Sequence, residues 1–292
     1  MSVEYSLFLG CTIPLRVSNY EISARRVYET LGIKLSDIQG AGCCGPVPVR
    51  SIDFNTWILM ACRNLALAER MKNDVVVLCN GCYGTLKEAN HLMYNDHKLR
   101  EAVNSGLRGV GLDYTGSVRV KHYIEVLYKD YGVDKIKSKV KGHLKGLKVA
   151  VHYGCHLLRP SDVTGFDNPF NPNMLDELVE LTGAVSVPWR LKLRCCGAPI
   201  LATNERIALK LTRDKLRSAK KAGADCLVTV CPFCEIMFDL QQLELDRTYG
   251  FKYDIPSLLY PQLLGLALGL DAEDLGFDLN RVPADAILER YQ

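Results

Sequence analysis

Ten of the twelve cysteines in this 292-residue chain form one pattern that is written twice. Each copy runs from Gly-Cys through an adjacent Cys-Cys pair to Cys-x-x-Cys, and 34 residues separate the pair from the last motif in both copies. The first set is Cys11, Cys43, Cys44, Cys79 and Cys82, and the second set is Cys155, Cys195, Cys196, Cys231 and Cys234. Core packing does not demand identical spacing in two places, so the repeat indicates two equivalent sites with five thiols each.

The segments between the cysteines repeat as well. Strand-like apolar runs that end at a cysteine are predicted at 3–11, 74–79, 147–155 and 225–231. Helices are predicted at 18–31, 57–71, 83–94, 173–181, 205–222 and 235–245. This alternation predicts an α/β fold of two pseudo-twofold-related domains with parallel, Rossmann-like sheets flanked by helices. Because reactive groups of such sheets collect at the carboxyl ends of the strands, we expect the five cysteines of each half at one rim.

The repeat also predicts the domain organisation. Residues 1–96 are expected to form the first domain, 97–146 a helical linker region, and 147–292 the second domain with a polar C-terminal tail. The apolar run 255–270 contains two prolines and is too short to span a bilayer. We expect that run in the core, with a docking face as the alternative.

The net charge and the N-terminal sequence limit which classes of protein this chain can belong to. The formal net charge of +3 is too small for bulk nucleic-acid binding, which needs a clustered basic excess. The first ten residues carry Glu4 and lack the basic start of a signal peptide. A cytoplasmic protein is therefore expected, and in that reducing compartment many cysteines indicate metal or redox chemistry rather than disulfides.

Four interpretations of the cysteines differ in how well they use five thiols. Structural, buried thiols suit Cys62 and Cys226, which have no counterpart in the other copy. An odd number of thiols per half disfavours disulfides. Zinc remains an alternative, although it takes four thiolates and leaves one thiol unused. Iron-sulfur clusters are favoured, with a fifth thiol that either completes an unusual cluster or works in catalysis.

At this point the chain resembles a known family. The spacing and the two Cys-Cys-Gly triplets at 43–45 and 195–197 look like the CCG-domain signature. That family includes the B subunit of heterodisulfide reductase from methanogenic archaea and iron-sulfur subunits of thiol-fumarate reductase, glycolate oxidase and lactate-utilisation complexes. The segments 79–86 (Cys-Asn-Gly-Cys-Tyr-Gly-Thr-Leu) and 152–160 (His-Tyr-Gly-Cys-His-Leu-Leu-Arg-Pro) look specifically like the heterodisulfide reductase B subunit. The chain departs from many relatives at 198–201, where Ala-Pro-Ile-Leu replaces a glycine-rich stretch.

The resemblance implies a cofactor, a reaction and partners. It implies two non-cubane [4Fe-4S] clusters, each held by all five cysteines of one half, and reduction of the coenzyme M–coenzyme B mixed disulfide to two thiols. The implied partners are the ferredoxin-like C subunit and the flavin-containing A subunit of the same reductase, with a hydrogenase or formate dehydrogenase. The alternative is a CCG electron-transfer subunit of a 2-hydroxy-acid oxidase or thiol-fumarate reductase complex. The sequence has no dinucleotide fingerprint, so electrons are expected to come from another protein.

The substrate implied by the resemblance is anionic, and this directs attention to the arginines near the cysteines. Arginine pairs well with oxyanions because its planar fork meets two oxygens. Arg16 and Arg159 follow the two Gly-Cys motifs closely, and Arg50 follows the first Cys-Cys pair. These three are predicted substrate-binding residues, and His156, next to a cysteine, is the predicted catalytic residue as a proton donor.

Overall fold

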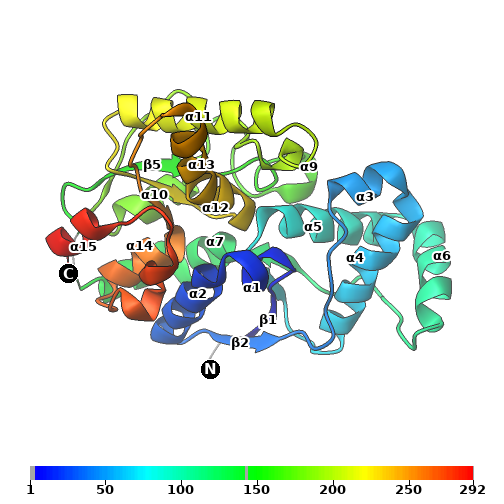
Figure 1. The fold of residues 1–292 in the computed structure, drawn as a ribbon. Helices are drawn as coiled ribbons and strands as arrows, with labels where there is room; N and C mark the ends of the chain where they lie inside the picture. Colours follow the sequence, from blue (N-terminus) through cyan, green and yellow to red (C-terminus); the bar gives the residue numbers. More distant parts are fainter. Residues whose placement is uncertain (1–3, 142–143, 292) are drawn as a thin grey trace.

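Two four-stranded sheets, one in each half of the chain, form the centre of the molecule. The computed structural model describes residues 4–141 and 144–291, so the predicted domain ends at 1–3 and 292 and the linker residues 142–143 lie outside the described residues. The strands are β1 (Glu4–Phe8), β2 (Lys34–Asp37), β3 (Val75–Val77), β4 (Val120–His122), β5 (Lys148–His152), β6 (Val185–Ser186), β7 (Cys226–Thr229) and β8 (Ser257–Leu259). Figure 1 shows the first half in blue and cyan and the second half in green to red.

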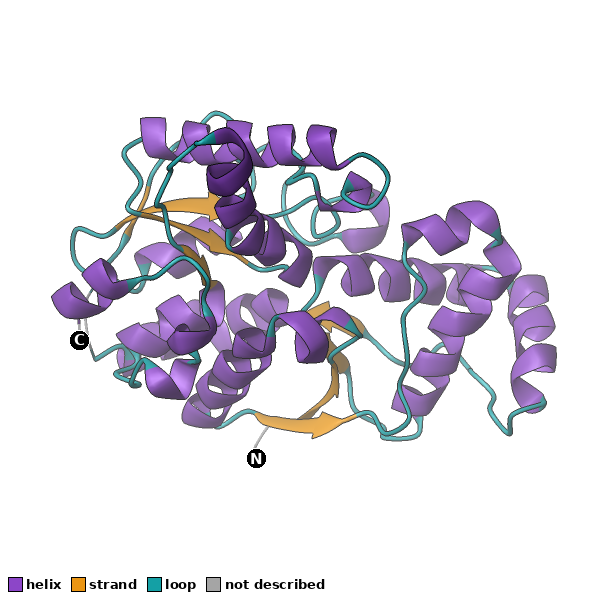
Figure 2. Cartoon of the chain, in the orientation of Figure 1, coloured by secondary structure: helices purple, strands orange, loops and turns teal. Residues whose placement is uncertain are grey.

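The two sheets have the same topology, which confirms the predicted fold class. Their strand orders are β2-β1-β3-β4 and β6-β5-β7-β8, and every pairing in both is parallel. The central strands are almost wholly buried, because helices cover both faces of each sheet. Figure 2 shows these helices in purple around the orange strands.

The helices fill the connections between the strands. The α-helices are α1 (Thr12–Arg16), α2 (Ser18–Leu31), α3 (Val47–Ile52), α4 (Phe54–Glu69), α5 (Asn80–Asn95), α6 (His97–Arg108), α7 (Tyr123–Glu125), α8 (Val133–Lys139), α9 (Ser161–Thr164), α10 (Met174–Glu180), α11 (Glu205–Lys221), α12 (Pro232–Phe238), α13 (Leu240–Tyr249), α14 (Tyr260–Ala267) and α15 (Asp285–Tyr291). A π-helix, η1 (Val126–Gly132), and three 3-10 turns, η2 (Ala198–Ile200), η3 (Glu273–Leu275) and η4 (Phe277–Leu279), complete the order.

One predicted helix, 235–245, is interrupted in the structure. It is divided into α12 and α13 at Asp239, whose carboxylate accepts hydrogen bonds from the backbone amides of Arg281 and Val282 at 2.7–2.9 Å. Asp239 therefore ties the C-terminal segment to this break, and the helix changes direction there.

The segment 97–146, which we expected to be a helical linker, contributes to the first sheet. It contains α6, α7, η1 and α8, and it also contains β4, which pairs with β3 through Val75–Val120 and Val77–His122. A three-residue strand is too short to show an alternating pattern, so the sequence did not reveal it. The first sheet therefore draws on residues beyond 96.

The apolar run 255–270 belongs to the core. It forms β8 and α14, and every residue of both elements is buried, which leaves no docking face on them. The segment that follows is tied down by Asn280, whose amide oxygen accepts from Asn19 of α2 and from Gln262 of α14, both at 2.9 Å. In the described part of the chain, no helix combines the length and the apolar character that a bilayer crossing requires.

Candidate functional site

The cysteines of each half lie where its strands end. Cys11 follows β1 and precedes α1, and Cys79 follows β3 and precedes α5, whose first turn carries Cys82. The second half repeats this with Cys231, which follows β7 and precedes α12. A Cys-x-x-Cys at the start of a helix places both thiols on one turn, beside the positive end of the helix dipole.

In the first half, four of the five thiols lie close enough together to shift one another's pKa. Cys44 contacts Cys43 and Cys82, and Cys82 contacts Cys79. These contacts with Cys43 and then Cys82 hold the pKa of Cys44 well below its usual value, whereas contact with Cys44 raises the pKa of Cys82. Cys11 is exposed, and it lies close enough to Cys43 for its charge to raise the pKa of that thiol further.

The second half has the equivalent arrangement. Cys155 contacts Cys195, Cys195 contacts Cys196, and the Cys234 thiol donates to Cys196 Sγ at 3.4 Å. Contact with Cys155 lowers the pKa of Cys195, and contact with Cys234 lowers the pKa of Cys231. The second cysteine of the pair and both cysteines of the Cys-x-x-Cys are buried in each half, and the remaining two are at least partly exposed.

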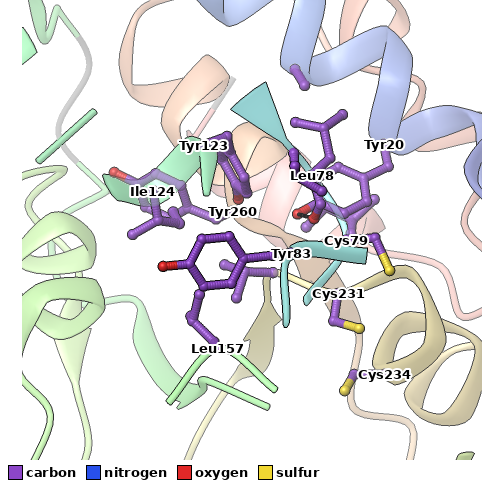
Figure 3. Close-up of a cluster of buried hydrophobic side chains, with 14 of the residues drawn as sticks. Tyr20, Leu78, Cys79, Tyr83, Tyr123, Ile124, Leu157, Cys231, Cys234 and Tyr260 are labelled. Atoms are coloured by element: carbon purple, nitrogen blue, oxygen red, sulfur yellow. Dashed lines mark hydrogen bonds between the residues drawn. The ribbon is translucent and has the colours of Figure 1, made fainter. Parts of the chain in front are cut away.

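The two sets of thiols meet at the junction of the halves. Cys79 of the first set lies next to Cys231 of the second (Figure 3), and each thiol shifts the pKa of the other, so a row of neighbouring thiols extends from Cys43 to Cys155. Figure 3 shows Cys79, Cys231 and Cys234 side by side, with the buried ring of Tyr83 nearby. The structure thus brings nine of the ten repeated cysteines into one continuous line.

Contacts across the junction are reciprocal. The amide of Asn80, in the first Cys-x-x-Cys, donates to Tyr153 O at 2.7 Å, directly before Gly154 and Cys155. The residue after that cysteine, His156, lies against Gly84 of α5. In the other direction, α1 packs against α12. Each helix that carries a Cys-x-x-Cys therefore contacts the segment that follows the other half's Gly-Cys.

The predicted substrate residues lie in different surroundings. His156 lies at the junction, against the first turns of α5. Arg159 is exposed, donates to Pro169 O at 3.2 Å and lines a groove of about 450 Å³. Arg16 is exposed at the end of α1. Arg50 is bound to Glu88 at 2.8 Å and stacks 5.2 Å from the Trp57 ring, so its charge is already paired.

Two residues close to the second set of thiols were missed by sequence reasoning. His152 is buried, and its Nε2 lies 3.3 Å from Cys234 Sγ while its Nδ1 donates to Lys192 O at 3.2 Å. Burial lowers the pKa of His152, so the ring is neutral. Lys215 is buried in α11. Aligning the two halves on their cysteines would have drawn attention to both residues, because the first half has Phe8 in place of His152 and Arg63 in place of Lys215.

The donor set fits an iron-sulfur cluster. Packed thiolates repel one another, so five thiols in contact ionise together only around a cationic centre. Contacts with neighbouring thiols lower the pKa of Cys44, Cys195 and Cys231 and raise the pKa of the thiols beside them. Among residues 4–141 and 144–291, no group of three or more His, Cys, Asp or Glu side chains is arranged to hold a single metal ion.

Comparison with known proteins identifies the family. The CCG cysteine-rich domain matches twice, at residues 5–87 and 149–239. The chain is 42% identical to the B subunit of the Ferredoxin/F(420)H(2)-dependent CoB-CoM heterodisulfide reductase of Methanosarcina acetivorans, over 96% of this chain and 94% of that protein. It is 36% identical to the 8-methylmenaquinol:fumarate reductase membrane anchor subunit of Wolinella succinogenes, over 97% of this chain and 99% of that protein.

A solved structure shares the fold. The crystal structure of a hypothetical protein from Helicobacter pylori has a TM-score of 0.78 at 18% identity, over 96% of this chain and 52% of that one. At that identity the likeness shows the fold alone. The two domain matches and the identity to full-length relatives show more: the chain belongs to the cysteine-rich CCG family, among the B subunits of heterodisulfide reductases, which are oxidoreductases.

Proposed function

We propose that this chain is the catalytic subunit of a heterodisulfide reductase, which reduces the coenzyme M–coenzyme B mixed disulfide to two thiols. In this proposal each set of five cysteines holds one non-cubane [4Fe-4S] cluster. The observation that carries the proposal is that the two five-cysteine sets lie next to each other, with Cys79 of the first beside Cys231 of the second (Figure 3). The 42% identity to a heterodisulfide reductase B subunit along nearly the whole chain supports the same reaction.

Reduction of a disulfide consumes two electrons and two protons and yields two thiols. The clusters, when bound, supply the electrons. The substrate can reach the cysteines from solvent, because Cys11 is exposed and Cys43, Cys155 and Cys195 are partly exposed. We therefore propose that the disulfide approaches each set on the side of these thiols. His156 lies at the junction of the halves and is proposed to deliver a proton to a departing thiolate.

A basic groove beside the second Cys-Cys pair suits the anionic ends of this substrate. Among the described residues, its lining includes Arg159, Arg190, Lys192 and Arg194 and no carboxylate. Lys192 is ion-paired with Asp176 at 2.6 Å, which leaves the three arginines to meet oxyanions. Because guanidinium groups bind phosphate and sulfonate oxygens in pairs, we propose that Arg159 holds one anionic end of the disulfide.

Arg159→Ala is therefore expected to weaken use of the disulfide by roughly ten- to hundredfold, since a hydrogen bond to a charged group contributes about 1.5–3 kcal/mol. The measurement is kcat/KM for the disulfide with an artificial electron donor. Arg50→Ala is the control, because Arg50 is engaged by Glu88, and it should retain most of the wild-type value. Unchanged kinetics in Arg159→Ala, with intact cluster spectra, would remove Arg159 from the site.

Electrons are proposed to arrive from a ferredoxin-like partner subunit, which a flavin-containing subunit and a hydrogenase or formate dehydrogenase supply in a cytoplasmic complex. The isolated chain should therefore reduce the disulfide with a strong one-electron donor such as reduced methyl viologen, and should not do so with a nicotinamide. Anaerobic assays with both donors check this expectation. Full activity of the chain alone with a nicotinamide would contradict the proposed role within a complex.

The second candidate is an iron-sulfur electron-transfer subunit of a fumarate reductase or 2-hydroxy-acid oxidase complex. The 36% identity to the Wolinella succinogenes protein favours it. The two candidates differ in where the chemistry occurs. Disulfide reduction by the purified chain supports the first, whereas reducible clusters without any disulfide reduction, together with copurification of a flavoprotein that acts on fumarate or a 2-hydroxy acid, support the second.

A further inference from the structure

Lys215 is a buried lysine that the proposed reaction does not use. It lies on α11 with only 1% of its surface exposed. Its ammonium group donates to Arg194 O at 2.9 Å and to Leu191 O, and it lies 4.5 Å from the centroid of the Trp189 ring. These contacts hold the ammonium group beneath the loop that leads into the second Cys-Cys pair.

The groups near Lys215 that can carry negative charge are thiols and not carboxylates. In the described part of the chain, no ion pair or hydrogen bond joins Lys215 to an Asp or Glu. Burial lowers the pKa of Lys215 to about 8, and the charges of Cys234, Cys196, Cys195 and Cys155 oppose that shift. A buried cation is costly without a partner, and here the second set of cysteines is the available counter-charge.

The first half has an exposed residue at the equivalent position. The gap between the Cys-Cys pair and the Cys-x-x-Cys is the same in both halves, so Lys215 corresponds to Arg63. Arg63 is exposed and its guanidinium donates to Gly40 O at 3.0 Å, where water screens its charge. Near the strand end the copies differ too, since the neutral His152 contacts Cys234 while Phe8 occupies the matching position.

We infer that Lys215 makes the two cluster sites unequal, by stabilising the reduced form of the cluster at the second set of cysteines. The inference rests on the proposed function, because it requires a cluster in each half. One-electron reduction, by a ferredoxin-like donor, adds one negative charge to a cluster, and a nearby buried cation stabilises that charge far more than an exposed one does. Through its charge, Lys215 thus determines which of the two sites holds the added electron.

The expected consequence is that the second site has the higher reduction potential. Water around the exposed Cys11 also stabilises a reduced cluster at the first site, but a fixed, unscreened charge in the interior has the stronger effect. An electron that enters the chain therefore settles in the second half, beside the groove lined by Arg159. The anionic substrate and the more easily reduced site then lie on the same side of the molecule.

Three variants of anaerobically purified full-length protein test this. Lys215→Gln keeps a donor for the loop carbonyls and removes the charge, Lys215→Arg keeps the charge, and Arg63→Gln is the matched control in the first half. The readout is a redox titration followed by electron paramagnetic resonance, which does not depend on turnover. Lys215→Gln should lower one midpoint potential and leave the other in place, and Lys215→Arg and Arg63→Gln should keep both wild-type values.

The outcomes separate the inference from the function on which it rests. Two intact clusters whose potentials are unchanged in Lys215→Gln would overturn the inference and leave the proposed function standing. Equal shifts of both potentials in Lys215→Gln would also overturn it, because they would show a general structural effect. Wild-type protein without iron would overturn the proposed function and the inference together.

Discussion

Cys231→Ala is expected to abolish disulfide reduction and to remove about four of about eight irons from the anaerobic protein. Cys231 is buried at the junction, where it contacts Cys234 of its own set and Cys79 of the other. Loss of this thiol removes a ligand from the second cluster and the contact that links the two sets. Iron content per chain and the rate with reduced methyl viologen are the two measurements.

The matched control is Cys226→Ala. Cys226 lies five positions earlier, on β7, is equally buried and has no counterpart in the first copy. Burial raises its pKa above the usual range, which is typical of a structural thiol. Iron content and rate should stay at wild-type levels in this variant. If both variants lose iron equally, or neither does, the ten repeated cysteines are not the ligand set.

Gly154→Ala is expected to separate the halves locally and to lower the free energy of unfolding substantially. Gly154 has φ of +76°, and a Cβ there would lie 2.4 Å from Asn80 Nδ2, the donor that binds Tyr153 O. The backbone strain costs about 1–2 kcal/mol. Displacement of the buried Asn80 amide costs about 1–3 kcal/mol more, because its donor is left without a partner.

Gly32→Ala is the matched control, because it introduces the same backbone strain at positive φ without a steric clash. Gly32 ends α2 with φ of +78°, and a Cβ there would meet no described atom within 4 Å. Urea unfolding of the metal-free variants should show a small loss for Gly32→Ala and a loss larger by about 1–3 kcal/mol for Gly154→Ala. Equal losses would mean that the Asn80 contact does not hold the two halves together.

The fold could be predicted where the sequence repeats and where a segment is long enough to show a clear hydrophobic period. The helix predicted at 18–31 is α2, and the strand-like runs that end at cysteines are β1, β3, β5 and β7. The sequence did not reveal β4, because three residues carry no measurable period. It did not reveal the break at Asp239 either, since that break depends on contacts with residues about forty positions later.

The candidate site, like the fold, could be predicted from the sequence only in part. The repeated pattern singles out all ten cysteines, because core packing alone does not require a Cys-Cys pair, a 34-residue gap and a Cys-x-x-Cys in both halves. The meeting of Cys79 with Cys231, and the Asn80 contact with Tyr153, depend on how the halves pack, which spacing does not determine. The sequence shows that His152 and Lys215 differ from Phe8 and Arg63 at the matching positions, but their place beside the thiols is seen only in the structure.

Metal and sulfide analysis of the anaerobically purified chain tests the central claim most directly. The claim is that both sets of five cysteines bind an iron-sulfur cluster. The expected result is about eight irons per chain with acid-labile sulfide, and a loss of about half of that iron when either set is disrupted. Stoichiometric zinc without sulfide, or iron confined to one half, would contradict it.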